Sequence, residues 1–216
     1  DLAMQKNANF NFNFQKGILY GQKGNTDLMI ETFLEESRRT AQMAQTIRSY
    51  FLRFLQDDTD GSFSTQLRKA LLIRAQKDKD LFWNDYLSWY FVQQQEYGKA
   101  FVQEKAIFRQ TSENLNQILF LGTLALDADQ KEAAEEILQF VIASTDHRDT
   151  LIQANSALLR LEMDKETNGN LEPKFLSLFE QFGQNTSTIE LQRQYANYLA
   201  FHRKQTQHAL QVLSDV

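Results

Sequence analysis

Residues 81–108, LFWNDYLSWYFVQQQEYGKAFVQEKAIF, decide the fold of this 216-residue chain. Leu87, Tyr90 and Phe91 recur at positions i, i+3 and i+4, the spacing that places side chains on one face of a helix. After a short glutamine-rich stretch, a second apolar stripe is made by Tyr97, Ala100, Phe101 and Ile107. The segment therefore predicts two consecutive helices joined by a short connection.

The next stretch of the chain repeats this pattern. One apolar stripe consists of Ile118, Leu121, Leu124 and Ala125, and the next of Ala134, Leu138, Val141 and Ile142. Ala100 and Ala134 hold the same place in their hairpins and lie 34 residues apart. A small residue at such a position lets one helix backbone approach another closely. The spacing predicts stacked helical hairpins that bury their apolar faces against their neighbours.

Two helix starts carry the pattern of a capping box, in which the first side chain and the residue three positions later bond to each other's backbone. The pairs are Asp129 with Glu132 and Ser187 with Glu190. Both predict helices that begin immediately after the capping residue.

Four stretches have small and aromatic residues in the register of the tetratricopeptide-repeat family, and the chain resembles that family. The first stretch has Gly17, Tyr20, the turn residue Gly24 and Phe33. The others have Leu87, Ser88, Phe91, Tyr97 and Ala100; Leu121, Gly122, Ala125, Ala134 and Leu138; and Ala196, Ala200, Ala209 and Leu213. Two hairpins of weaker resemblance span 41–77 and 148–182, and the second contains an insertion from Lys165 to Asn170.

The resemblance implies an all-α fold, a right-handed α-solenoid of about six antiparallel helical hairpins. It implies one TPR-like repeat domain over residues 1–216, belonging to a longer repeat protein because the last helix ends in apolar residues. Those residues are Leu210, Val212 and Leu213. The family's usual tryptophan position is occupied in turn by Asn13, Asn84, Ile118 and Arg193, which indicates a divergent branch.

Composition agrees with a helical protein and excludes several classes. One proline and 8 glycines are too few for a strand-and-turn protein. A net charge of -5 argues against a nucleic-acid partner, which calls for a basic surface. No run of about 18 apolar residues exists, so no transmembrane helix is expected. Without cysteine there is no disulfide, thiolate nucleophile or cysteine-bound zinc.

The sequence has no pattern of catalytic residues, and we expect neither an enzyme nor a cofactor. The histidines His147, His202 and His208 do not form the spacing of a helical metal pair. The stretch from Asp57 to Gly61 is the most metal-like, but the twelfth position of a calcium loop would be Leu67, not a bidentate glutamate. We interpret it as an interhelical turn in which Gly61 is left-handed and Ser62 caps the next helix, with weak calcium binding as the alternative.

In the family that the chain resembles, the first helix of each hairpin lines the concave face and contacts the ligand. Carried over by register, the contact residues are Phe82, Asp85, Trp89 and Gln93; Asn116, Leu119, Thr123 and Asp127; and Gln194, Tyr198 and His202. Aromatic rings with neighbouring amides and acids suit a peptide or a glycan. The alternative for Phe82 and Trp89 is that they belong to the core between repeats.

These observations predict a non-catalytic protein-interaction scaffold that binds a peptide or protein partner on its concave face. The alternative is a carbohydrate-binding component of a bacterial envelope, based on Trp83, Tyr86, Trp89 and Tyr90 in one helix. A glutamine-rich chain with a Tyr-Gly-Lys-Ala turn is similar to long repeat proteins of bacterial cell envelopes. That similarity implies the periplasm or cell envelope, with the cytoplasm left open.

Overall fold

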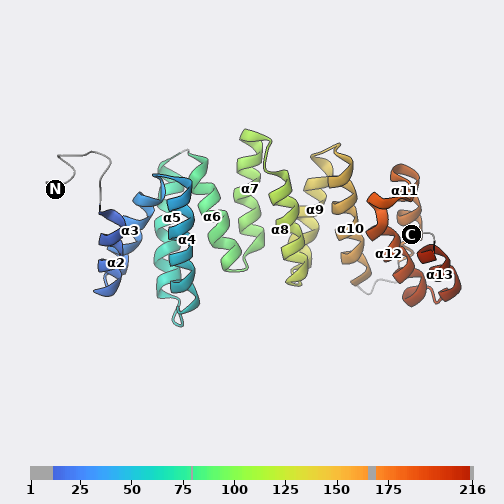
Figure 1. Cartoon of the computed structure of the whole chain (residues 1–216), viewed down its shortest axis with the longest axis horizontal. Helices are drawn as coiled ribbons and strands as arrows, with labels where there is room; N and C mark the ends of the chain where they lie inside the picture. Colours follow the sequence, from blue (N-terminus) through green and yellow to red (C-terminus); the bar gives the residue numbers. More distant parts are fainter. Residues whose placement is uncertain (1–11, 79, 165–168, 215–216) are drawn as a thin grey trace. The chain divides into compact units, whose positions relative to one another are not determined.

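The computed structural model describes residues 12–78, 80–164 and 169–214 (Figure 1). All regular structure in these ranges is helical, without any strand, and the prediction of an all-α fold is confirmed. No helix in the described ranges is long and apolar enough to cross a membrane. Of the predicted insertion from Lys165 to Asn170, residues 165–168 lie outside the described residues.

The helices fall into two compact units, residues 1–93 and 94–216. The first contains α2 (Asn13–Gln22), α3 (Thr26–Ser37), α4 (Ala41–Gln56), α5 (Ser62–Lys77) and α6 (Leu81–Gln93). The second contains α7 (Tyr97–Thr111), α8 (Leu115–Asp127), α9 (Lys131–Ala143), α10 (Arg148–Asp164), α11 (Glu172–Phe182), the 3-10 turn η1 (Thr186–Thr188), α12 (Ile189–Asn197), the π-helical segment η2 (Tyr198–His202) and α13 (Thr206–Ser214).

In the first unit, the pairing of α2 with α3 depends on a glycine. A Cβ atom on Gly17 would lie 2.6 Å from Cδ1 of Phe33, so only glycine lets the two helices approach this closely. Phe33 is fully buried, and its ring contacts those of Phe14, Tyr50 and Phe51. The close contact of α2 with α3 therefore depends on the absence of a side chain at Gly17.

In the second unit, Gly122 plays the same part between α8 and α9. A Cβ atom on Gly122 would lie 3.0 Å from Leu138, and Ala134 is fully buried in the same contact layer. Helix α8 also packs on α10, and α10 packs on α12. A second core joins α10 to α13 around the fully buried Phe175. The packing within each unit is consistent with a helical repeat fold.

Both predicted capping boxes are wrong. Asp129 has a left-handed backbone with φ of 57°, and the residue before α9 is Gln130. A residue with positive φ cannot serve as an ordinary N-cap, whose backbone is extended. Near Ser187, the capping residue is Asn185, which forms a capping box with Thr188 and begins the 3-10 turn η1 instead of α12.

The stretch from Asp57 to Gly61 is an interhelical turn, as one of the two interpretations predicts. Gly61 is left-handed with φ of 70° and directly precedes α5, and Ser62 is the first residue of that helix instead of its cap. The carboxylate oxygens of Asp58 accept hydrogen bonds from the backbone N–H groups of Phe63 and Ser64, at 3.1 and 2.7 Å. Among the described residues, no group of three or more metal-ligating side chains is placed to hold an ion.

Candidate functional site

The predicted contact residues of the first unit lie on α6 and are partly exposed. Phe82, Asp85, Trp89 and Gln93 are all half-buried. Trp83, Tyr86 and Tyr90 of the same helix are buried. Of the four aromatic residues on which the carbohydrate alternative rests, Trp89 alone reaches the surface, so the four do not form an open stacking platform.

Arg48 on α4 organises the exposed side of α6. Its guanidinium group forms an ion pair with Asp85 and lies over the rings of Tyr86 and Trp89, 4.6 and 5.8 Å from their centroids. The arginine side chain is only 15% exposed. Burial raises the pKa of the Tyr86 hydroxyl above its ordinary value. The ion pair and the cation–π contacts hold Asp85 and Trp89 in one arrangement.

The predicted residues of α8 lie in the second unit and differ in what they do. Asn116 and Asp127 are exposed, and Leu119 is buried. The Thr123 hydroxyl donates a hydrogen bond to the carbonyl oxygen of Phe120, at 2.7 Å. Asp127 forms an ion pair with Arg160 of α10. Helix α8 therefore has exposed polar residues at its two ends, and Asp127 links it to α10 through an ion pair.

Tyr198 supports packing more than it offers a surface. Only 3% of it is exposed, and its hydroxyl accepts a hydrogen bond from the Leu171 N–H and donates one to Oδ1 of Asn170, both at 3.1 Å. The hydroxyl thereby fixes the start of α11. The exposed ring of His202 stacks on Tyr198, with centroids 5.6 Å apart, and Gln194 is half-buried.

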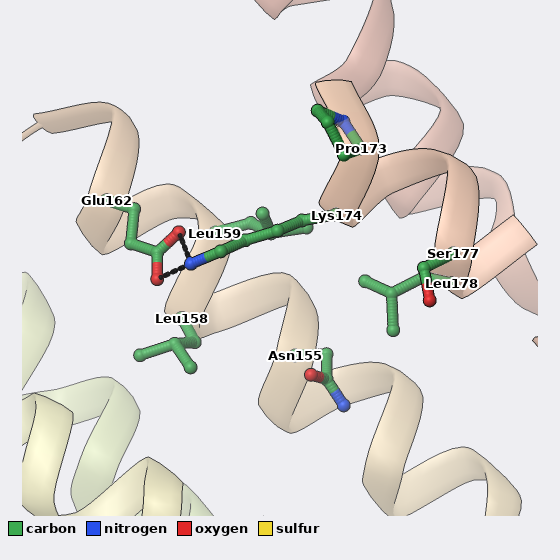
Figure 2. A pocket seen from close by; sticks show the side chains of 8 residues that line it. All are labelled: Asn155, Leu158, Leu159, Glu162, Pro173, Lys174, Ser177 and Leu178. Atoms are coloured by element: carbon green, nitrogen blue, oxygen red, sulfur yellow. Dashed lines mark hydrogen bonds and ion pairs between the residues drawn. The ribbon is translucent and has the colours of Figure 1, made fainter. Parts of the chain in front are cut away.

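Sequence reasoning missed an open pocket between α10 and α11, shown in Figure 2. Its volume is about 390 Å³, and its walls are mostly apolar, formed by Leu158, Leu159, Leu178 and Pro173. At one end Lys174 of α11 reaches across to α10, where its Nζ lies 2.5 and 2.7 Å from the two carboxylate oxygens of Glu162 (Figure 2). Asn155 and Ser177 add an amide and a hydroxyl to the lining.

The pocket exists because α11 buries its other face. Phe175, Phe179 and Phe182 point into the core, where Phe175 and Phe179 contact the ring of Tyr195 on α12. The opposite residues of α11, including Pro173 and Ser177, are left facing α10 across the pocket. An apolar pocket with a few polar groups is the usual form of a binding site.

Comparison with known protein families, with curated proteins and with solved structures finds no match for this chain.

Proposed function

We propose that the chain is a non-catalytic protein-interaction scaffold built from tetratricopeptide-like repeats. The contacts of Gly17 with Phe33 and of Gly122 with Leu138 support this repeat type, because both occur in the register of the family. The single observation that carries the binding function is the pocket between α10 and α11. The partner is a protein segment that places a large apolar side chain in this pocket.

The lining of the pocket suits such a side chain. A volume of about 390 Å³ accommodates a leucine, methionine or phenylalanine side chain together with neighbouring backbone. Burial of an apolar side chain of this size contributes roughly 1.5–3 kcal/mol to binding. The Asn155 amide and the Ser177 hydroxyl can bond to the partner's backbone, and the Glu162–Lys174 pair limits the segment at one end. Buried anchors of this kind dominate the affinity of protein interfaces.

The exposed side of α6 offers a second contact of similar character within the first unit. Trp89 is half-buried beside Arg48 and Asp85, which fix its position before any partner arrives. Tryptophan and arginine are the residue types most enriched at binding hot spots. A partner that contacts this surface would gain from side chains that are already ordered.

The test is to fill the pocket. We expect Ser177→Trp to abolish capture of the partner from the native source, since the indole occupies the space that the partner's side chain needs. Leu176→Trp is the matched control, because Leu176 is exposed on the same helix and does not line the pocket. Circular dichroism must show that both variants keep the helical content of the wild type.

The capture result decides the proposal when the bound proteins are compared by mass spectrometry. Loss of the same protein from Ser177→Trp, with retention by Leu176→Trp, supports binding in the pocket. Retention of every bound protein by a folded Ser177→Trp variant would remove the pocket from the function.

A further inference from the structure

A charged groove runs between α3 and α5 on the first unit. It consists of two adjoining pockets of about 340 and 470 Å³ that share Glu31 and Ile73 in their linings. Buried Ile30 and Ala70 lie at its floor, and Ile73 is 40% exposed at the junction of the pockets. The groove thus has apolar surface along its middle.

The two walls of the groove carry opposite charge along α3 and α5. Just beyond both helices the signs are reversed, where Arg38 binds Asp78 at 2.5 Å. On α3, Asp27, Glu31 and Glu35 recur every four residues and share one face of the helix. On α5, the facing positions are Lys69, Ile73 and Lys77, with Arg74 beside them. Asp27 and Lys69 line one pocket, and Glu35 and Lys77 line the other, so the two helices run in the same direction along the groove.

One ion pair inside the chain spans the middle of the groove. Arg74 binds Glu31 through two hydrogen bonds of 3.0 and 2.5 Å, and this contact lowers the pKa of the Glu31 carboxyl. The charged side chains nearer the two ends of the groove include some that are not paired with any described residue. Asp27, Glu35 and Lys69 form no ion pair with any residue in the described part of the chain. Apart from the Arg74–Glu31 and Arg38–Asp78 pairs, the groove therefore presents acidic side chains on α3 and basic side chains on α5 to solvent.

We propose that this groove is a self-association surface, occupied by the α3–α5 face of a second copy of the chain. A two-fold axis parallel to the helices places the acidic α3 of each copy over the basic α5 of the other. Asp27 then meets Lys69 of the second copy at one end, and Glu35 meets Lys77 at the other. The surface is complementary to itself, which is the requirement of an isologous dimer.

The register of the charges favours a second copy over an unrelated partner. Rotation about a two-fold axis parallel to the helices does not change a residue's position along the helix direction. Within one chain, Asp27 lies level with Lys69 and Glu35 lies level with Lys77, so each acid of one copy comes to lie opposite a base of the other. The alternative axis, across the helices, would place acid over acid and base over base. The exposed Ile73 adds apolar contact at mid-height.

The test is charge reversal in the whole chain, read by sedimentation velocity from about 10 µM to about 1 mM. The wild type is expected to form a dimer that weakens as salt is added, because the outer ion pairs are screened. The double variants Asp27→Lys with Glu35→Lys, and Lys69→Glu with Lys77→Glu, are each expected to be monomeric. An equimolar mixture of the two variants is expected to form a heterodimer, since each supplies the charge that the other needs.

Matched controls separate this result from a change in net charge or in folding. Glu113→Lys with Asp146→Lys changes two exposed acids outside the groove and is expected to leave the dimer intact. A chain with all four groove substitutions restores the complementarity and is expected to dimerise again. A monomeric wild type at the highest concentration overturns the proposal. So does a mixture of folded variants that stays monomeric, or a dimer that both reversals leave unchanged.

Discussion

At the scale of single residues, Gly17 decides how closely α2 and α3 approach. The ring of Phe33 that a new Cβ atom would meet is locked among three other aromatic rings, so it cannot move aside. We expect Gly17→Ala to destabilise the protein by about 1–3 kcal/mol, despite alanine's higher helix propensity. Urea unfolding followed by circular dichroism measures the change.

Gly98 provides the matched comparison for this substitution. It lies in the first turn of α7, and a Cβ atom there would meet nothing within 4 Å. Gly98→Ala is therefore expected to leave stability unchanged or raise it by about 0.5 kcal/mol. Equal destabilisation by both substitutions would contradict close packing at Gly17.

Tyr195 gives the molecule a pH dependence at the alkaline end. Burial and the neighbouring Glu172 carboxylate, 3.2 Å from its hydroxyl, raise the pKa of Tyr195 to about 12. Because the folded state holds this proton more tightly than the unfolded state, Tyr195 stabilises the fold below pH 10. That contribution is lost as the pH rises toward 12. A titration of phenolate absorbance should lose its step near pH 12 in Tyr195→Phe.

Glu172→Gln tests the cause of this shift. The substitution removes the negative charge beside the hydroxyl, so the pKa of Tyr195 should fall toward its ordinary value. An unchanged titration curve in Glu172→Gln would mean that the carboxylate has no part in the shift.

Residue-scale features were predictable from sequence where one residue type has one physical use. Gly17 and Gly122 stand opposite large side chains in the register that the sequence indicates, and Gly61 has the left-handed backbone expected of it. The helix caps were not predictable in the same way. Asp58, Asp60 and Ser62 all can cap a helix, and the path of the turn chooses among them.

At the scale of elements, α6 separates its two tryptophans. Trp83 is 3% exposed and lies between the guanidinium groups of Arg38 and Arg74, 5.6 and 5.5 Å from its ring. Trp89 is half-buried. We expect Trp83→Ala to cost about 3–5 kcal/mol, as for a core aromatic, and Trp89→Ala about 1 kcal/mol.

Fluorescence quenching measures the same difference without large destabilisation. The chain has 2 tryptophans, so Trp83→Phe leaves Trp89 as the single emitter and Trp89→Phe leaves Trp83. Acrylamide should quench Trp89 much more strongly than Trp83. Equal quenching of the two would mean that Trp89 is core rather than a partly open contact.

Helix register shows which residues of one helix share a face, and it placed Phe82, Asp85 and Trp89 together on α6. That this face contacts a partner stays a prediction. Sequence reasoning missed Arg48, which belongs to another helix, and the pocket between α10 and α11, because both depend on how helices meet in space. Helix register alone predicted Tyr198 to be a surface contact. In the structure it is buried, and its hydroxyl accepts a hydrogen bond from the Leu171 N–H at the start of α11.

At the scale of the whole molecule, the chain divides into two compact units, residues 1–93 and 94–216. The sequence predicts one continuous repeat domain, and that continuity stays a prediction. Local periodicity indicates each hairpin, but the strength of packing from one hairpin to the next depends on contacts far apart in sequence. In repeat proteins, stability is roughly a sum of such neighbouring interfaces, so a weaker interface separates units that unfold independently.

Phe175 allows this division to be tested. It is fully buried in the core that joins α10 to α13, and it contacts the rings of Tyr195 and Tyr198. Phe175→Ala should destabilise the second unit by about 3–5 kcal/mol. Hydrogen exchange followed by mass spectrometry should show lost protection in α10–α13, while α2–α6 keep that of the wild type. An equal loss of protection in α2–α6 would show that the chain opens as one cooperative body. Protection retained in α2–α6 would mean that the buried residues of the first unit keep it folded without the core around Phe175.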